Sequence, residues 1–268
     1  MWPDGVVVRE AEPGERHSPW RVGGSCAWFA VLHRRATLAD GWSALRQAGG
    51  APMPLGAGTR TLVRGGGLDR PLARLGVDFL HIERGEGLWF VGAAVPVPVL
   101  LHAWALAGRT GLEAWTSLAG SVGAAVALDS AGVLPAIGAV EALQRGQLRE
   151  GTLEDAKRAL IITGVWLRSA PAEVLPKKAK ARSTLPQGWW QRDGRIDPVA
   201  ELVRAGVAGT RLRDVRIPSE DIEQFVNTGR ATLDDVELLA RSVCDKVKRT
   251  SGADLVSRVQ EVGKKRRS

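Results

Sequence analysis

Residues 55–63 have the sequence LGAGTRTLV, a short apolar strand that enters a glycine-rich turn and continues as a second apolar stretch. Glycines at positions 56 and 58 let backbone amides approach a ligand closely, and Thr59, Arg60 and Thr61 add side-chain donors. The stretch therefore predicts a cradle for a pyrophosphate group. Gly-x-Gly turns also occur in many proteins that bind no phosphate, so this signal needs support from the rest of the chain.

The sequence on either side of the turn predicts alternating strands and helices. Before it, an apolar strand at 25–32 precedes a helix that begins with the cap Thr37-x-x-Asp40 and ends at Gly49-Gly50, which makes a strand-helix-strand unit with residues 53–55. After it, we expect a hairpin of strands at 79–83 and 88–91, a helix at 97–107, a second hairpin at 139–144 and 147–149, and a strand at 160–167.

A change of composition at residues 171–186, which are rich in Pro, Lys and Ala, predicts a linker. Beyond it we expect a short helix at 198–204, a strand at 211–217 and a long helix at 233–247 with a cap at Thr232. The chain therefore has an α+β pattern with two domains, residues 1–170 and residues 171–268.

Composition excludes several classes of protein. The 44% apolar and 25% charged residues are typical of globular proteins, and no apolar stretch reaches the roughly 18 residues of a membrane span. The N-terminus lacks the order of a secretory signal, so we expect a cytoplasmic protein, or one inside an organelle if the host is a eukaryote. Cys26 and Cys244 lie in apolar surroundings without metal-ligand spacing and are expected to be buried thiols, and the four scattered histidines predict no metal site.

The formal charge of +8 is concentrated in two runs of the C-terminal part. Clusters of this kind can neutralise the phosphates of a nucleotide or of RNA, and the adjacent tryptophans could stack bases. The alternatives are a solvated linker and tail, and indoles that fill the interior. The candidate nucleic-acid residues are Lys177, Lys178, Lys180, Arg182, Trp189, Trp190, Arg192, Lys264, Lys265, Arg266 and Arg267.

The order of the glycine segments is more specific than any one of them. A second small-residue segment, Gly120-Ser121-Val122-Gly123, could lie against a flat ligand, and near the C-terminus comes Val226-Asn227-Thr228-Gly229. Together with the turn at Gly56, their order and spacing resemble the UDP-N-acetylenolpyruvoylglucosamine reductase (MurB) family over about nine-tenths of the chain. The resemblance implies a two-subdomain FAD-binding fold of the PCMH/MurB type in residues 1–170, and a smaller MurB C-terminal α/β domain in residues 171–268.

In that family NADPH reduces FAD, and the flavin passes hydride to an enolpyruvyl UDP-sugar while a serine protonates the product and a glutamate and an arginine stabilise the intermediate. The resemblance places Trp189 at the serine position and Arg258 at the glutamate position. The segment with the arginine is deleted here, with Arg158 as a possible shifted survivor. Asp129, Glu113 and Glu261 are the nearest replacement acids.

On the cofactor side the resemblance implies FAD contacts, with Gly-Ser-Asn of the family changed to Gly58-Thr59-Arg60. Arg60 would either bind the pyrophosphate or fill its place. The candidate cofactor residues are Gly56, Gly58, Thr59, Arg60, Thr61, Gly120, Ser121, Val122 and Gly123.

Three functions stay open at this point. The first is a catalytically inactive family member kept as a binding or structural module, with RNA, as in a ribosome, or a protein as its partner. The second is a divergent but active FAD- and NADPH-dependent reductase of peptidoglycan synthesis that binds the UDP-sugar. The third is a flavin-binding redox protein with another substrate.

Overall fold

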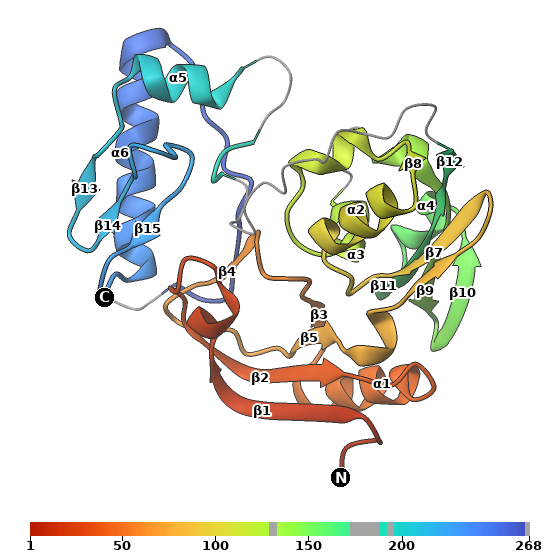
Figure 1. The fold of residues 1–268 in the computed structure, drawn as a ribbon. Helices are drawn as coiled ribbons and strands as arrows, with labels where there is room; N and C mark the ends of the chain where they lie inside the picture. The colour runs from red at the N-terminus through yellow and green to blue at the C-terminus, as the bar shows by residue number, and fades with distance from the viewer. Residues whose placement is uncertain (129–132, 172–187, 192–195, 266–268) are drawn as a thin grey trace. The chain divides into compact units, whose positions relative to one another are not determined.

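The structure, a computed structural model, describes residues 1–128, 133–171, 188–191 and 196–265 (Figure 1). The chain divides into two compact units, and both are discontinuous in sequence. The first comprises Met1–Ala11, Ala27–Ala57 and Arg70–Leu185, and the second comprises Glu12–Cys26, Gly58–Asp69 and Pro186–Ser268. Two short N-terminal segments therefore belong to the same unit as the C-terminal residues. The division into domains 1–170 and 171–268 stays a prediction.

A four-stranded sheet forms around the predicted strand-helix-strand unit. Its order is β1 (Val6–Pro13), β2 (Ser25–Leu32), β5 (Leu72–Leu75) and β3 (Met53–Pro54), and β5 runs parallel to β2 and β3. Parallel neighbours need a crossover, which α1 (Leu38–Gly49) provides. Leu38, Trp42 and Leu45 of α1 pack into the core with Leu32 and Phe79, which confirms this unit.

The start of α1 differs from the expected cap. Thr37 makes no side-chain bond to the first turn of the helix, because its hydroxyl donates to the carbonyl of Asp4 at 2.7 Å. The predicted Thr-x-x-Asp cap is therefore wrong in its bonding, although the helix begins where the pattern placed it. The hydroxyl instead joins the helix start to the chain before β1.

The larger sheet of the first unit is antiparallel. Its order is β10 (Gln147–Gly151), β9 (Ile137–Gln144), β11 (Ile161–Arg168), β7 (Leu88–Gly92) and β6 (Ile82–Arg84), so both predicted hairpins form. The helices of this part are α2 (Val97–Leu106), α3 (Val122–Ala127) and α4 (Leu153–Ala156), and its short helices are η2 (Val77–Phe79), η3 (Glu113–Ser117) and η4 (Leu134–Ala136). A two-stranded pair of β8 (Arg109–Thr110) and β12 (Ala170–Pro171) completes it.

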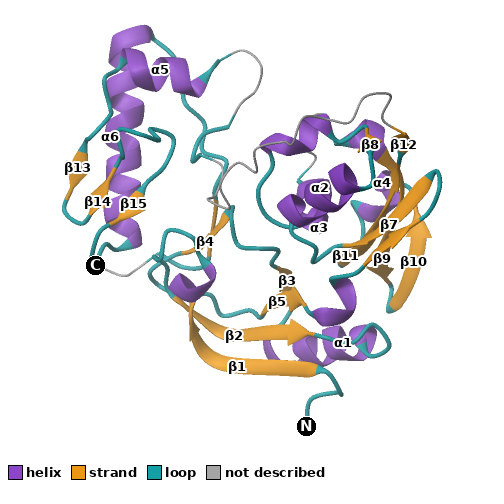
Figure 2. Ribbon diagram, viewed as in Figure 1, coloured by secondary structure: helices purple, strands orange, loops and turns teal. Residues whose placement is uncertain are grey.

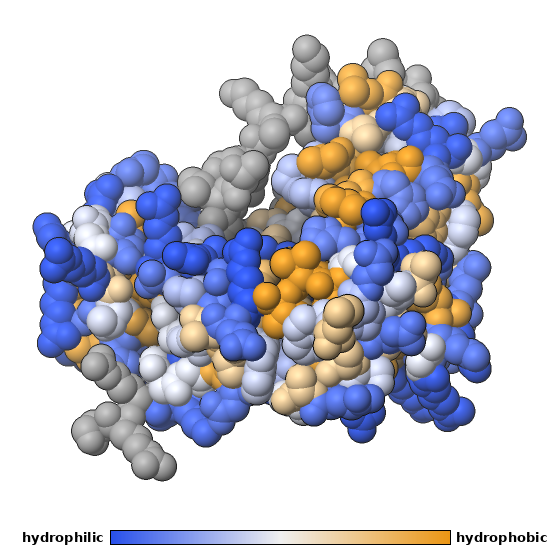
Figure 3. All heavy atoms as spheres, turned by 90° about the horizontal axis from the view of Figure 1, so that it is seen from below, coloured by the Kyte–Doolittle hydropathy of each residue, from blue (hydrophilic) through white to orange (hydrophobic). Residues whose placement is uncertain are grey.

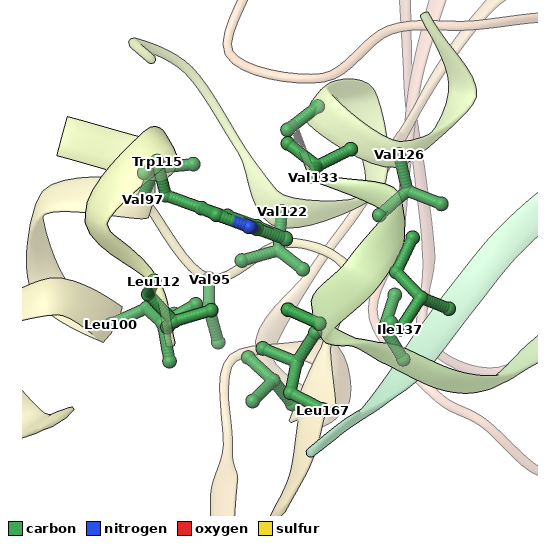
Figure 4. Packing of buried hydrophobic residues seen from close by; sticks show 14 of the residues in the cluster. Val95, Val97, Leu100, Leu112, Trp115, Val122, Val126, Val133, Ile137 and Leu167 are labelled. Carbon is green, nitrogen blue, oxygen red and sulfur yellow. The ribbon is translucent and has the colours of Figure 1, made fainter. Parts of the chain in front are cut away.

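Apolar packing fixes α2 and α3 beside β7 and β11 (Figure 2). The core contains Trp115, which is fully buried and lies among Val97, Val122 and Leu112 in Figure 4. Residues of β7 and β11, such as Val91 and Val165, close the same cluster from the sheet. Because residues 120–123 lead into and begin α3, this packing also fixes their position next to β7 and β11.

The second unit is built around a long helix. Its elements are η1 (Gly14–His17), the parallel pair β4 (Thr61–Val63) and β16 (Gln260–Val262), α5 (Pro198–Arg204), α6 (Leu233–Ser251) and the small sheet of β13 (Arg211–Leu212), β14 (Val215–Arg216) and β15 (Val226–Asn227). The buried face of α6, including Val236, Leu239 and Val243, packs with Trp20, Leu62 and other apolar residues. The helix at 198–204 and the cap at Thr232 are confirmed.

The predicted strand at 211–217 is wrong, because this segment is a hairpin. Arg213 has φ of 51°, a left-handed conformation that turns the chain between β13 and β14. The Arg211 side chain donates to the carbonyl of Arg213, and the Arg213 guanidinium donates to Asp235 at 2.6 Å. These bonds stabilise a turn that the alternating apolar pattern did not predict.

The α+β fold class is confirmed by these helices and by the parallel and antiparallel strand pairs. The face in Figure 3 is mostly hydrophilic, with smaller hydrophobic patches between charged side chains. Among the helices of the described residues, none is long and apolar enough to cross a membrane.

Candidate functional site

The glycine turn is held against the start of α3 within the first unit. A Cβ atom added to Gly56 would lie 2.6 Å from the hydroxyl of Ser121 and 2.9 Å from the Cβ of Ala124. Those distances leave no room for a side chain, so glycine at this position allows the close approach. The structure therefore brings together two of the segments that the sequence singled out, Gly56 and Ser121.

Arg74 braces the same turn, and the sequence reasoning missed it. It lies in β5, its Nε donates to the carbonyl of Gly56 at 3.1 Å, and its guanidinium lies 5.4 Å from the centre of the Phe29 ring. Burial lowers the pKa of Arg74. A charged residue inside the apolar stretch 72–75 was the signal that could have revealed it, because a buried charge needs a partner.

The other half of the turn, residues 58–61, belongs to the second unit. Gly58 has φ of 77°, and the carbonyl of Arg60 accepts a hydrogen bond of 2.7 Å from the amide of Gln260. Thr61 begins β4, which pairs with β16. Burial lowers the pKa of Arg60. Within the described residues its guanidinium has no hydrogen bond and no ion pair.

The amides at the start of α3 are already bonded to the chain itself. Val122 donates to the carbonyl of Val95 and Gly123 to that of Ala93, both at 2.9 Å, and the Ser121 hydroxyl accepts from Ala124 as a helix cap. These bonds join α3 to the loop between β7 and α2. They leave the amides of residues 122–124 engaged, so a ligand contact from this segment would need other atoms.

Trp189, which the resemblance places at the serine position, is part of the core of the second unit. It is 3% exposed, and its ring packs edge to face against Trp20 at 5.2 Å and Phe225 at 4.9 Å between centroids. Its amide donates to the carbonyl of Glu223 at 2.8 Å. The indole therefore fills the interior of this unit.

Arg258, placed at the glutamate position, lies beside Trp189 in the structure. Its amide donates to the carbonyl of Trp189 at 3.0 Å, and Trp190 forms an isolated bridge with Ser257. The two positions implied by the resemblance are thus neighbours, although they are far apart in sequence. Neither side chain is a carboxylic acid, a hydroxyl or another group that donates a proton at neutral pH.

Of the remaining acid and base candidates, Glu113 and Arg158 belong to the first unit and Glu261 to the second. Arg158 is exposed after α4 in the first unit. The Glu113 carboxylate accepts a hydrogen bond from the amide of Gly111 at 2.9 Å and another from the Thr110 hydroxyl. These two bonds lower the pKa of Glu113. Glu261 pairs with Arg64 at 3.1 Å. Asp129 lies outside the described residues.

The Val226–Gly229 segment has a structural part in the second unit. The Asn227 side chain donates to the carbonyl of Arg21 at 3.2 Å and accepts from the amides of Gly229 and Ala231. The chain then enters α6 through the capping box of Thr232 and Asp235. The motif therefore ties an N-terminal loop to the start of the long helix.

Of the nucleic-acid candidates, Lys177, Lys178, Lys180, Arg182, Arg192, Arg266 and Arg267 lie outside the described residues. Trp189 and Trp190 are 3% and 2% exposed, so they offer no face for a base to stack on. This burial agrees with the alternative in which the indoles fill the interior. Lys264 pairs with Asp69, and Lys265 is exposed.

The thiols are free, and the residues that the structure describes contain no group of ligands that could hold a metal ion. Cys26 is fully buried as expected, and burial together with Glu12 raises its pKa to about 11. Cys244 is half-buried, and its pKa is raised by burial and by Asp245 and Asp254.

Comparison with known proteins agrees with this arrangement. The family profile for the C-terminal domain of UDP-N-acetylenolpyruvoylglucosamine reductase matches residues 184–262. Reductases of this name from Nitrosomonas eutropha and Alkalilimnicola ehrlichii are 27% and 28% identical, each over 96% of this chain and over 89% and 95% of their own length.

Among solved structures, MurB from Thermus caldophilus superposes with a TM-score of 0.75 and 22% identity, covering 96% of this chain and 98% of its own. This likeness shows the same fold. The sequence matches extend along nearly the whole chain at low identity. Residues 184–262 thus match the C-terminal domain of the UDP-N-acetylenolpyruvoylglucosamine reductase (MurB) family, and the chain is similar to these reductases over nearly its whole length.

Proposed function

We propose that this protein has lost the reductase reaction of its family and serves as a binding or structural module. The burial of Trp189 in the core of the second unit supports this most strongly. Reduction of an enolpyruvyl double bond by hydride leaves a carbanion that must receive a proton. An indole packed between Trp20 and Phe225 is neither an acid nor placed at the wall of a site.

The neighbouring position supports the same conclusion. A guanidinium keeps its proton at all ordinary pH values, so Arg258 cannot serve as an acid. It also reverses the charge that a glutamate would supply to the intermediate. Removal of one member of a catalytic unit usually abolishes most of the rate, and here both neighbouring positions are changed.

The test is NADPH oxidation in the presence of FAD and the enolpyruvyl UDP-sugar. We expect no substrate-dependent turnover from the wild-type chain, from Trp189→Ser, or from Arg258→Glu. Trp189→Ser also removes a large core side chain, at a cost of about 3–5 kcal/mol, so its folding must be checked by circular dichroism. Arg258→Glu, at a half-buried position, leaves the core intact. Turnover by the wild type would refute the proposal, and turnover by Trp189→Ser alone would show that only the proton donor had been lost.

A retained FAD is compatible with this proposal. When bound, FAD supplies a ring that accepts and donates hydride. Of the two candidate segments, residues 58–61 fit its pyrophosphate better, since the Arg60 charge has no partner in the described chain while the amides of residues 122–124 are engaged. The absorbance spectrum of the natively purified protein decides whether flavin is present.

The formal charge of +8 favours an anionic partner for such a module. RNA, for instance in a ribosome, is the proposed partner, with a protein assembly as the alternative. Exposed Lys265 is among the described residues that could contact phosphates. Co-purification of RNA that is removed by ribonuclease and by high salt would support the RNA partner, and its absence at low salt would contradict it.

A further inference from the structure

One face of the small sheet in the second unit carries two arginines opposite each other. Strands β13 and β14 lie along α6 (Figure 1), and Leu212 and Val215, which are paired across these strands, pack into the apolar core with that helix. Side chains alternate between the two faces of a strand, so the next opposite pair, Arg211 and Arg216, points away from α6. Both arginines are exposed. They form the outer face of this hairpin.

This cross-strand pair is electrostatically unfavourable. Opposite residues of antiparallel strands have Cα atoms about 4.5–5.5 Å apart, so like charges at these positions repel each other. Arg211 is partly compensated, because its Nε donates to the carbonyl of Arg213 at 2.7 Å and its Nη2 lies 3.7 Å from an Asp214 carboxylate oxygen. Within the described residues the Arg216 side chain makes no hydrogen bond and no ion pair. The sheet therefore keeps a repulsive pair in which one guanidinium is available to a partner.

A third arginine lies close to the same hairpin. The amide of Arg230 donates to the Asp214 carboxylate at 2.9 Å, and Thr228 donates to the Asp214 carbonyl through its amide and its hydroxyl. These bonds join the segment after β15 to the turn between β13 and β14. Arg230 is exposed, and its guanidinium has no bond in the part of the chain that the structure describes. Three arginines are thus gathered in one region, namely Arg211, Arg216 and Arg230.

The composition of this region favours a phosphate-bearing strand over a protein as its partner. Val226 of β15, which lies opposite Arg216, is half-buried and adds little apolar surface, whereas protein interfaces have an apolar and aromatic centre. A guanidinium has a planar set of donors that matches two phosphate oxygens. The repulsion between neighbouring guanidiniums is relieved when each one binds an anion, as successive phosphates of a strand allow.

We infer that the outer face of β13 and β14, together with the adjacent Arg230, is the surface on which an RNA strand docks through its phosphate backbone. The inference rests on the proposed function, from which the RNA partner is taken. The contacts are made to phosphates, so they position the strand without reading its base sequence.

The test is binding of a fluorescein-labelled oligouridine of about 20 nucleotides to the full chain, followed by fluorescence anisotropy at several salt concentrations. Each phosphate contact with a single strand contributes about 0.7 to the slope of log affinity against log salt. Arg211→Gln combined with Arg216→Gln should therefore lower this slope by about 1.4 and weaken binding at least about tenfold at about 0.1 M salt.

A double variant with the same change of charge provides the control. Arg46 of α1 and Arg145 between β9 and β10 are exposed residues of the first unit, and neither guanidinium has a bond within the described ranges. Arg46→Gln combined with Arg145→Gln should bind the RNA as wild type does. Equal binding by the two double variants would overturn this surface while leaving the RNA partner in place.

Thermal unfolding separates binding from a structural part for the arginines. Without RNA, Arg216→Gln should melt no lower than wild type, because it removes a repulsive charge and no hydrogen bond. With RNA, the melting temperature should rise more for wild type than for this variant. A variant that melts at a clearly lower temperature without RNA would overturn the inference, since weaker binding would then follow from lost structure.

Two further outcomes bear on the partner itself. Competition by polyglutamate that equals competition by unlabelled RNA at the same concentration of charge would overturn the assignment to RNA and indicate an acidic protein. Absence of RNA binding by wild type would overturn both this surface and the proposed RNA partner. The NADPH assay tests the loss of reductase chemistry independently of all these results.

Discussion

A partly buried ion pair in the first unit, between Arg35 and Glu141, provides a test of which interactions stabilise this unit. Glu141 of β9 accepts from Arg35 Nη1 at 2.7 Å and from Arg35 Nη2, and the Thr163 hydroxyl of β11 donates to it at 2.6 Å. The side chain of Glu141 is 12% exposed and that of Arg35 is 39% exposed. Arg35→Ala would leave a buried carboxylate with one neutral hydrogen bond.

The expected loss follows from these exposures. Breaking a fully buried pair costs about 3–5 kcal/mol, and the partial exposure of Arg35 reduces this to about 2–3 kcal/mol. The guanidinium also lies 6.0 Å from the centre of the Phe90 ring, and losing that contact adds about 0.5 kcal/mol. Urea unfolding followed by tryptophan fluorescence measures the sum.

Two further variants control the result. Lys157→Ala removes the partner of Glu154 from an exposed pair and should cost less than about 1 kcal/mol. Arg35→Ala combined with Glu141→Gln should recover part of the loss, because it removes the uncompensated charge. If Arg35→Ala unfolds within about 0.5 kcal/mol of wild type, the ion pair does not stabilise this unit and the reasoning from burial fails.

Three other predictions concern single residues. Burial and the nearby Glu12 raise the pKa of Cys26 from 9.0 to about 11, so its thiol should resist alkylation by iodoacetamide at pH 8. The free energy of unfolding should fall as pH rises from about 9 through 11, because the thiol ionises first in the unfolded chain. Asp235→Ala should cost about 1–2 kcal/mol by removing a capping box. Burial by itself would raise the pKa of the Asp235 carboxyl, but hydrogen bonds from Thr232 and Arg213 outweigh burial, so this pKa is lowered. The contribution of Asp235 to the free energy of unfolding should therefore be present above pH about 4 and lost in acid. Gly123→Ala should cost about 1–3 kcal/mol, since its Cβ would lie 2.7 Å from that of Ala93.

Each of these has a direct check. Alkylation by iodoacetamide, followed by mass spectrometry, tests the prediction for Cys26. Reaction of Cys26 in the folded protein as fast as in the urea-unfolded protein would contradict it. Urea titrations at neutral and acid pH test Asp235, and a loss that grows as pH falls would contradict the second. Gly87→Ala is the matched control for Gly123→Ala, because nothing lies within 4 Å of its added Cβ. Equal costs for the two glycines would contradict the third.

Local patterns predicted those elements whose signals lie within a few residues. The apolar spacing and terminal glycines of α1, the prolines at the start of α2 and the capping box of α6 are all contained in single helices. The turn at Arg213 was missed because a left-handed arginine has no sequence signature comparable to glycine.

The site was less predictable because its partners come from distant segments. Nothing in residues 72–75 states that Arg74 will reach the carbonyl of Gly56. The engaged amides at the start of α3 depend on carbonyls of residues 93 and 95, and the contact of Arg258 with Trp189 depends on how the second unit folds. Motif order indicated the similarity to these reductases, whereas tertiary hydrogen bonds decide which atoms remain available to a ligand.

The pairing of β4 with β16 has a consequence for synthesis of the chain. Arg64, which follows β4, and Glu261, which lies within β16, are 197 positions apart, so the strand at residues 61–63 is synthesised long before its partner. During translation Leu62 and Trp20 lack the C-terminal residues that bury them in the folded protein. The nascent chain therefore exposes this apolar surface during most of its synthesis. We expect chaperones to bind the exposed surface at that stage.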